Sequence, residues 1–170
     1  MEQLERARRY LDRLRSLYSG IFTTSADRDL YEDDAISFFM HCYYVRDWII
    51  HLNKVGITAS QVDEFINSHN ELKICTDLCN GSKHCRLERN IRSGRQPHIA
   101  AKRYDTSTWL TGSGGGNVVK GRYTVVTASG TIDALDLAER CIEPPRGGLI
   151  LRVISDWIGF YNHQHPLQNN

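Results

Sequence analysis

The sequence predicts an α+β protein in which helices predominate, with four to five helices in a bundle and a β-hairpin inserted before the C-terminal helices. Apolar residues recur at helical spacing through most of residues 1–95 and again in 132–163. Between them, residues 96–131 carry β-forming residues on both sides of a glycine-rich segment. Because 170 residues is the size of one domain, we expect a single domain over 1–170, with a frayed tail at 164–170.

Two long helical segments come first. In LERARRYLDRLRSLYSGI the apolar residues share one face, which predicts an amphipathic helix that ends near Gly20. Acidic residues then lead into EDDAISFFMHCYYVRDWIIHLN, where negative charge suits a helix N-terminus. This second helix is predicted to end near Asn53, before Gly56.

Shorter helices follow, marked by two capping-box patterns. Thr58 stands three residues before Gln61, and Ser68 stands three residues before Glu71. The patterns predict two short helices, or one kinked helix, over ASQVDEFINS and NELKICTDLC. The last helix should end at the Asn-Gly of residues 80–81, because glycine suits the left-handed conformation that ends many helices.

The residue composition changes after Pro97, where β-forming residues and glycines become frequent. HIAAKRY and GRYTVVTA predict two strands, closed by turn residues at 129–130. The glycine-rich segment between them predicts an exposed, mobile loop over 112–117, because consecutive glycines lose most backbone entropy on ordering. Asp133 is a predicted N-cap for the helix DALDLAERCIE, and LILRVISDWIGFYN predicts a final helix.

Composition predicts a cytoplasmic protein. Five cysteines are an odd number, which is typical of reduced thiols rather than of a disulfide framework. The chain lacks a stretch of about eighteen apolar residues and its first residues are charged, so we expect no membrane segment and no signal peptide. Although the net charge is only +1, the chain contains a basic segment. This segment either binds the phosphates of a nucleic acid or is a solvated loop without a ligand. Its basic residues, accompanied by the single acid Glu88, are Lys83, Arg86, Arg89, Arg92, Arg95, Lys102 and Arg103.

Arg46 stands on the apolar side of the second predicted helix. At about 100° per residue it falls in the arc that contains Phe38 and Cys42, whereas Asp47 and His51 fall on the other side. An arginine facing a core needs a partner that offsets its desolvation. Arg46 is therefore either a functional group or a structural ion pair whose stem packs while its head reaches water.

The segment CTDLCNGSKHC combines cysteines with a polar helix end. Three residues separate Cys75 from Cys79, and His84 adjoins Cys85, which is an awkward arrangement for one tetrahedral zinc ion. We therefore expect Cys75 and Cys79 to be buried thiols that pack as small apolar groups, with no metal and no cofactor. The polar end from Asn80 to His84 either holds a phosphate or carboxylate, or only caps the helix.

The residues RDWIIH resemble the signature of the HEPN superfamily, in which four to six residues separate an arginine and a histidine. The helical layout before residue 96 is also similar to the HEPN bundle. The resemblance implies a homodimer and metal-independent RNA cleavage of the toxin or phage-defence type. His51 would activate the ribose 2′-hydroxyl or protonate the leaving oxygen, Arg46 would stabilise the phosphorane, and Asp47 would orient the histidine.

A second resemblance covers more of the chain. FFMHCYYVRDWI together with LKICTDLCNGSKH is similar to a group of small bacterial proteins that have no established activity. This resemblance spans most of the sequence. It implies no function.

Three functions follow from these patterns. The one we favour is a HEPN-like RNA-binding protein or endoribonuclease whose anion- or RNA-binding residues are Asn80, Lys83, His84, Arg86 and Arg89. The second is a non-catalytic helical module that dimerises or binds a protein partner through the aromatic residues Phe38, Phe39, Tyr43, Tyr44 and Trp48. The third is a small-anion or nucleotide site.

The first and third functions share one geometric expectation. The chain after Asn53 should fold back along the second helix, which would bring Lys83 and His84 into a cleft with Arg46. Three positively charged side chains repel one another, so they can lie in one cleft only when a negative group lies between them. We therefore expect Asp47, Asp77 or a bound anion in contact with Arg46 or Lys83.

Overall fold

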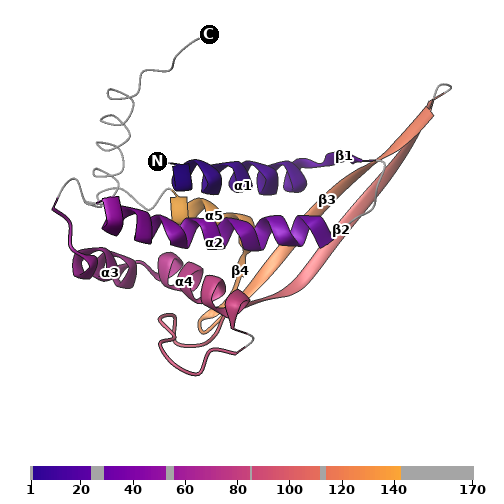
Figure 1. Cartoon of the computed structure of the whole chain (residues 1–170). Coiled ribbons are helices and arrows are strands. Elements are labelled where there is room, and N and C mark those ends of the chain that lie inside the picture. Colours follow the sequence, from indigo (N-terminus) through magenta and orange to yellow (C-terminus); the bar gives the residue numbers. More distant parts are fainter. Residues whose placement is uncertain (1, 24–28, 53–55, 85, 112–113, 143–170) are drawn as a thin grey trace, which may run out of the picture.

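The computed structural model describes residues 2–23, 29–52, 56–84, 86–111 and 114–142, which form a helical body with a long β-ribbon projecting from it (Figure 1). The order of elements is α1 (Glu2–Ser19), β1 (Ile21–Thr23), α2 (Asp29–Leu52), α3 (Ala59–Ser68), α4 (Asn70–Lys83), β2 (His98–Thr111), β3 (Gly114–Thr127), β4 (Gly130–Asp133) and α5 (Ala134–Ile142). The expected mixed α+β class with predominant helices is confirmed. None of the described helices is both long and apolar enough to cross a membrane.

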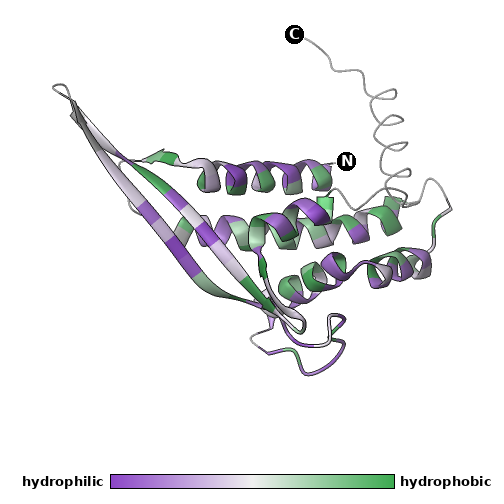
Figure 2. Ribbon diagram, turned by 180° about the vertical axis from the view of Figure 1, so that it is seen from behind, coloured by the Kyte–Doolittle hydropathy of each residue, from purple (hydrophilic) through white to green (hydrophobic). Residues whose placement is uncertain are grey.

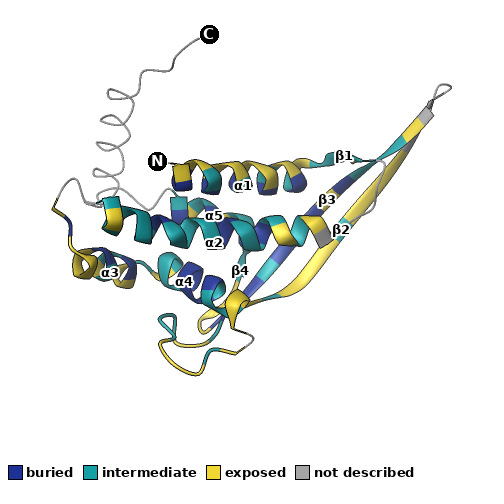
Figure 3. Ribbon diagram, in the orientation of Figure 1, coloured by how far each residue is buried: buried dark blue, intermediate teal, exposed yellow. Residues whose placement is uncertain are grey.

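Helices α1 and α2 pack antiparallel and supply much of the core. The side chain of Gln3 contacts His41, and Arg13 contacts Asp34, so the start of α1 lies beside the later part of α2. The apolar face of α1 is buried and its other face is exposed (Figure 3). The buried residues of α1 recur every three or four positions, as predicted for an amphipathic helix.

The sheet is antiparallel throughout and is organised around β3. Strand β2 pairs with β3 along one edge, while β1 and β4 pair with separate parts of its other edge. The hydroxyl of Tyr18 occupies the gap between β1 and β4: it accepts from the backbone N–H of Tyr123 at 3.0 Å and donates to the carbonyl of Tyr123 at 3.3 Å. Burial raises the pKa of Tyr18 to about 12, so the hydroxyl keeps its proton.

The inner face of β3 belongs to the same core as the helices. Val119, Tyr123 and Val125 form one buried cluster with residues of α1, α2, α4 and α5, whereas hydrophilic residues alternate along the ribbon (Figure 2). The core therefore extends beyond residues 1–95, where the sequence predicted the helical bundle core of the single domain. Periodicity identified the helices but did not reveal that β3 completes their core.

Two helix boundaries differ from those predicted. The capping box of Thr58 and Gln61 is confirmed, but that of Ser68 and Glu71 is wrong, because Ser68 ends α3 and its hydroxyl donates to the carbonyl of Phe65. Helix α4 continues past residues 80–81 to Lys83. Gln96 occupies the space beside Gly81 that a side chain would take, and its Nε2 would lie 3.1 Å from a Cβ at that position.

The ribbon is longer than predicted. Residues 114–117, predicted as a mobile loop, form the first part of β3, because Gly114 to Gly116 continue the ladder with Thr111 to Trp109 of β2. Residues 112 and 113 lie outside the described residues, as do the predicted final helix and the tail. The turn at residues 129–130 and the N-cap are confirmed, with Asp133 Oδ1 accepting from the N–H of Leu135 at 2.9 Å.

Gly121 is the point of closest approach between β3 and α1, and we predict that it does not tolerate a side chain. A Cβ there would lie 2.8 Å from Cδ2 of buried Leu17. Overpacking of this kind costs about 1 to 3 kcal/mol, so urea denaturation of Gly121→Ala should show a loss of that size. The penalty should largely disappear when Leu17→Ala is also present. An equal penalty in both backgrounds would contradict the assigned contact.

Candidate functional site

The Arg46 side chain ends on carboxylates and not in an open cleft. Helix α2 runs without a break past Arg46 and directs its side chain toward α3. The guanidinium donates to both oxygens of Asp63, from Nε to Oδ1 at 2.9 Å and from Nη2 to Oδ2 at 2.7 Å. Nη1 donates to Asp47 Oδ1 at 2.8 Å. The expected contact with Asp47 is present, and the main partner is Asp63.

Asp63 also binds a second arginine. Arg92 donates from Nη2 to Asp63 Oδ1 at 3.0 Å and from Nη1 to the side-chain oxygen of Asn67 at 3.1 Å. Two arginines and two aspartates therefore meet where α2, α3 and the loop after α4 converge. The formal charges of the two arginines and the two aspartates sum to zero.

This arrangement changes the acidity of the partners. The hydrogen bond from Arg46 lowers the pKa of Asp63 to about 2, against the opposing effect of partial burial, and the hydrogen bond to Asp63 raises the pKa of Arg46. Asp63 thus stays ionised at every physiological pH. The network has the features of a structural ion pair.

The three residues predicted to be catalytic do not converge within one chain. His51 is exposed in the last turn of α2, and five positions on a continuous helix place it about 140° from Arg46. Asp47 contacts the arginine and not the histidine among the described residues. Within the described part of the chain, His51 is therefore not placed to take or give a proton at the Arg46 guanidinium.

The loop after α4 is held by buried Asp77. We call residues 84–97 the basic loop; residue 85 lies outside the described residues. Asp77 Oδ2 accepts from the N–H and hydroxyl of Ser93 at 2.7 and 2.6 Å, and Oδ1 accepts from the N–H of Arg92 at 3.1 Å. Gln96 accepts from the N–H of Leu87 at 2.8 Å. The loop consequently has a defined position on the helical body.

Three arginines of the basic loop point their charge at solvent. Arg86, Arg89 and Arg95 are exposed, and none of them forms an ion pair with a described residue. The single acid in the loop, Glu88, is also exposed. The arrangement gives the loop a net positive charge that is open to a ligand.

The remaining predicted anion-binding residues lie at the end of α4. Lys83 Nζ lies 4.5 Å from the centre of the Tyr44 ring, His84 is exposed, and the Asn80 carbonyl accepts from the N–H of His84 at 3.0 Å. The cavity that Arg46 lines includes neither Lys83 nor His84. The described contacts do not join these three residues into one site: Asp63 on α3 takes the place at Arg46 that an anion was expected to fill, and Lys83 lies over Tyr44.

The aromatic surface proposed for a protein partner is largely core. Phe38 and Phe39 are 0% and 1% exposed, and their rings pack edge to face with centroids 5.1 Å apart. Tyr43, Tyr44 and Trp48 are half-buried. Phe38 and Phe39 are therefore unavailable to a protein partner, whereas Tyr43, Tyr44 and Trp48 keep partial exposure.

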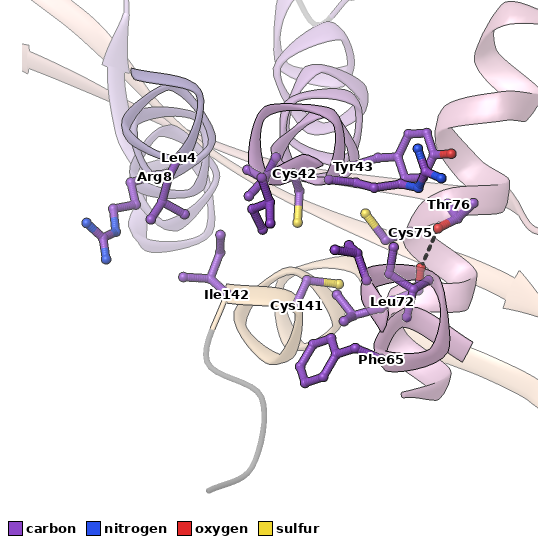
Figure 4. Close-up of a pocket in the computed structure, with 15 residues that line it drawn as sticks. Leu4, Arg8, Cys42, Tyr43, Phe65, Leu72, Cys75, Thr76, Cys141 and Ile142 are labelled. Carbon is purple, nitrogen blue, oxygen red and sulfur yellow. Dashed lines mark hydrogen bonds between the residues drawn. The ribbon is translucent and has the colours of Figure 1, made fainter. Parts of the chain in front are cut away.

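The sequence did not predict a cluster of three cysteines inside the protein. Cys42 of α2, Cys75 of α4 and Cys141 of α5 place their Sγ atoms within 4.8 Å of one another, and the three side chains point toward a common centre (Figure 4). We call this group the thiol cluster. It borders a cavity of about 100 Å³. Cys75 and Cys79 are buried as predicted, but only Cys75 belongs to the cluster.

Comparison of the chain with protein-family models, with curated proteins and with solved structures finds no match. Its function is therefore inferred from its own side chains. In the part of the chain that the structure describes, the basic loop and the thiol cluster offer chemistry that packing does not use.

The Asp63 ion pairs should make stability depend on pH. Because its folded pKa is lowered, Asp63 stabilises the protein above the unfolded carboxyl pKa of about 4, and that contribution disappears as pH falls toward about 2. Asp63→Asn should cost about 1 to 2 kcal/mol at neutral pH, since solvent screens a side chain that is 30% exposed.

Urea denaturation across this pH range measures the effect. Asp105→Asn, which removes an exposed pair with Arg103 at 3.4 Å, is the matched control and should change stability by less than about 0.5 kcal/mol. A constant difference between the Asp63 variant and the wild type at all pH values would contradict the prediction.

Proposed function

We propose that the protein binds RNA through the basic loop. The observation that carries the proposal is the exposure of Arg86, Arg89 and Arg95 without ion-pair partners among the described residues. Phosphates of a nucleic acid are ligands for which guanidinium groups are well matched, because the planar fork donates two hydrogen bonds to one phosphate. The resemblance of RDWIIH to HEPN proteins supports RNA as the ligand.

The way the loop is anchored favours binding over accidental charge. Asp77 of α4 accepts three hydrogen bonds from the loop, Gln96 accepts a fourth within the loop, and Arg92 contributes its charge to Asp63 instead of to solvent. A loop fixed in this way loses less entropy when it binds a ligand. One arginine therefore holds the loop in place, and three remain for phosphates.

Binding without cleavage is the simpler part of the RNA hypothesis. The half-buried guanidinium of Arg46 is neutralised by two carboxylates, and His51 lies on another side of α2. Cleavage would require these groups to meet at one phosphate. We infer that Arg46 supports the position of the loop through the Asp63 that it shares with Arg92.

RNA affinity should weaken with salt and depend on the exposed arginines. Each phosphate contact on a single strand contributes about 0.7 to the slope of log affinity against log salt concentration, so replacing Arg86, Arg89 and Arg95 by alanine should reduce that slope by about 2. Fluorescence anisotropy with a labelled single-stranded RNA measures both affinity and slope.

The matched control removes the same charge elsewhere. Replacing Arg6, Arg9 and Arg13 of α1 by alanine lowers the net charge equally but leaves the basic loop intact. Affinity should fall at least tenfold more in the loop variant than in this control. Equal losses in the two variants would mean that only net charge matters, and the loop would not be the site.

His51→Ala should leave RNA binding unchanged within twofold, because His51 is exposed in the last turn of α2 and none of the described hydrogen bonds or ion pairs joins it to the basic loop. The labelled RNA should also remain intact on a denaturing gel with the wild type. If the wild type cuts the RNA and His51→Ala does not, the protein is a ribonuclease and the binding-only proposal is wrong.

A further inference from the structure

The thiol cluster brings together three soft ligands from three different helices. Cys42, Cys75 and Cys141 are far apart in sequence and meet only because α2, α4 and α5 pack around one point (Figure 4). Cys75 and Cys141 are buried and Cys42 is partly buried. Three cysteine side chains on one centre are a ligand set that thiophilic ions prefer.

The sulfur positions are close to those that one ion requires. At an ion–sulfur distance of about 2.3 Å, three sulfur ligands lie roughly 3.4 to 4.0 Å apart, depending on the bond angles. The Sγ atoms already lie within 4.8 Å of one another, so small side-chain rotations bring them to a common ion. Two thiols now use backbone carbonyls as acceptors, Cys75 with Phe39 at 3.4 Å and Cys141 with Glu71 at 3.5 Å.

The surroundings restrict the charge of the ion. The cavity beside the cluster is lined mainly by apolar side chains, and its two arginines already have carboxylate partners, Arg8 with Glu5 and Arg46 with Asp63 and Asp47. Three thiolates with a monovalent ion carry a net charge of −2, and with a divalent ion −1. Burying uncompensated charge is costly, whereas a trivalent ion gives a neutral complex.

We propose that Cys42, Cys75 and Cys141 form a three-sulfur site for a soft trivalent ion of the arsenic(III) class. Arsenous acid, As(OH)₃, reacts with the three thiols to form three As–S bonds. Each hydroxide leaves as water with one thiol proton, so three waters are released and no electrons are transferred. The product is neutral and needs no fourth ligand, in keeping with the apolar cavity.

Arsenite titration of the full, reduced chain tests the site. Native mass spectrometry should find one arsenic per chain, with three hydrogens lost, and binding should raise the thermal unfolding midpoint because the folded state alone assembles the three sulfurs. Cys75→Ser and Cys141→Ser should each weaken binding at least tenfold and abolish the rise in midpoint.

Cys79→Ser provides the matched control. Cys79 is a buried cysteine one turn after Cys75 on the same helix but outside the cluster, so its substitution should leave arsenite affinity within twofold of the wild type. Should the variants of the two buried ligands fail to fold, Cys42→Ser decides the question, because residue 42 keeps partial exposure. Arsenite binding that survives Cys42→Ser, or that is lost in Cys79→Ser, overturns the assignment. So does binding of zinc but not arsenite by the wild type.

Discussion

The cost of burying charge is the constraint on which the arrangement of α2, α3, α4 and the basic loop depends. Arg46 stands on a core-facing arc, so its guanidinium requires a carboxylate, and α3 supplies Asp63 in bidentate geometry. Asp63 then accepts Arg92, and this contact draws the loop toward α3. Asp77 is fully buried and meets the same requirement by accepting donors from the loop backbone and Ser93.

The sequence predicted those parts of the fold that depend on local patterns. The amphipathic period predicted α1, acidic residues marked the start of α2, and side-chain caps located the starts of α3 and α5, at Thr58 and Asp133. Features that depend on pairing across the fold were missed. Strand β1 has only three residues, and Gly114 to Gly116 have no intrinsic preference for a strand until β2 offers them partners.

The same limit applies to the candidate sites. The helical wheel showed that Arg46 needs a negative partner, and Asp47 was among those expected, but no local pattern pointed to Asp63 on another helix. For the thiol cluster, the position of Cys42 on the apolar arc of α2 was visible in the sequence. Its convergence with Cys75 and Cys141 was not, because it depends on how α2, α4 and α5 pack together.

Helix α4 separates the two sites that these interactions create. Cys75 faces α2 and α5, whereas Asp77, about 200° around the helix, faces the basic loop. The two residues share no side-chain partner among the described contacts. Substitutions in separate contact networks usually have additive effects, so changes to the thiol cluster and to the exposed loop arginines report on different properties of the protein. A coupling between them would pass through α4 or α2, since Cys42 and Arg46 also lie on one helix and Arg46 shares Asp63 with Arg92 of the basic loop.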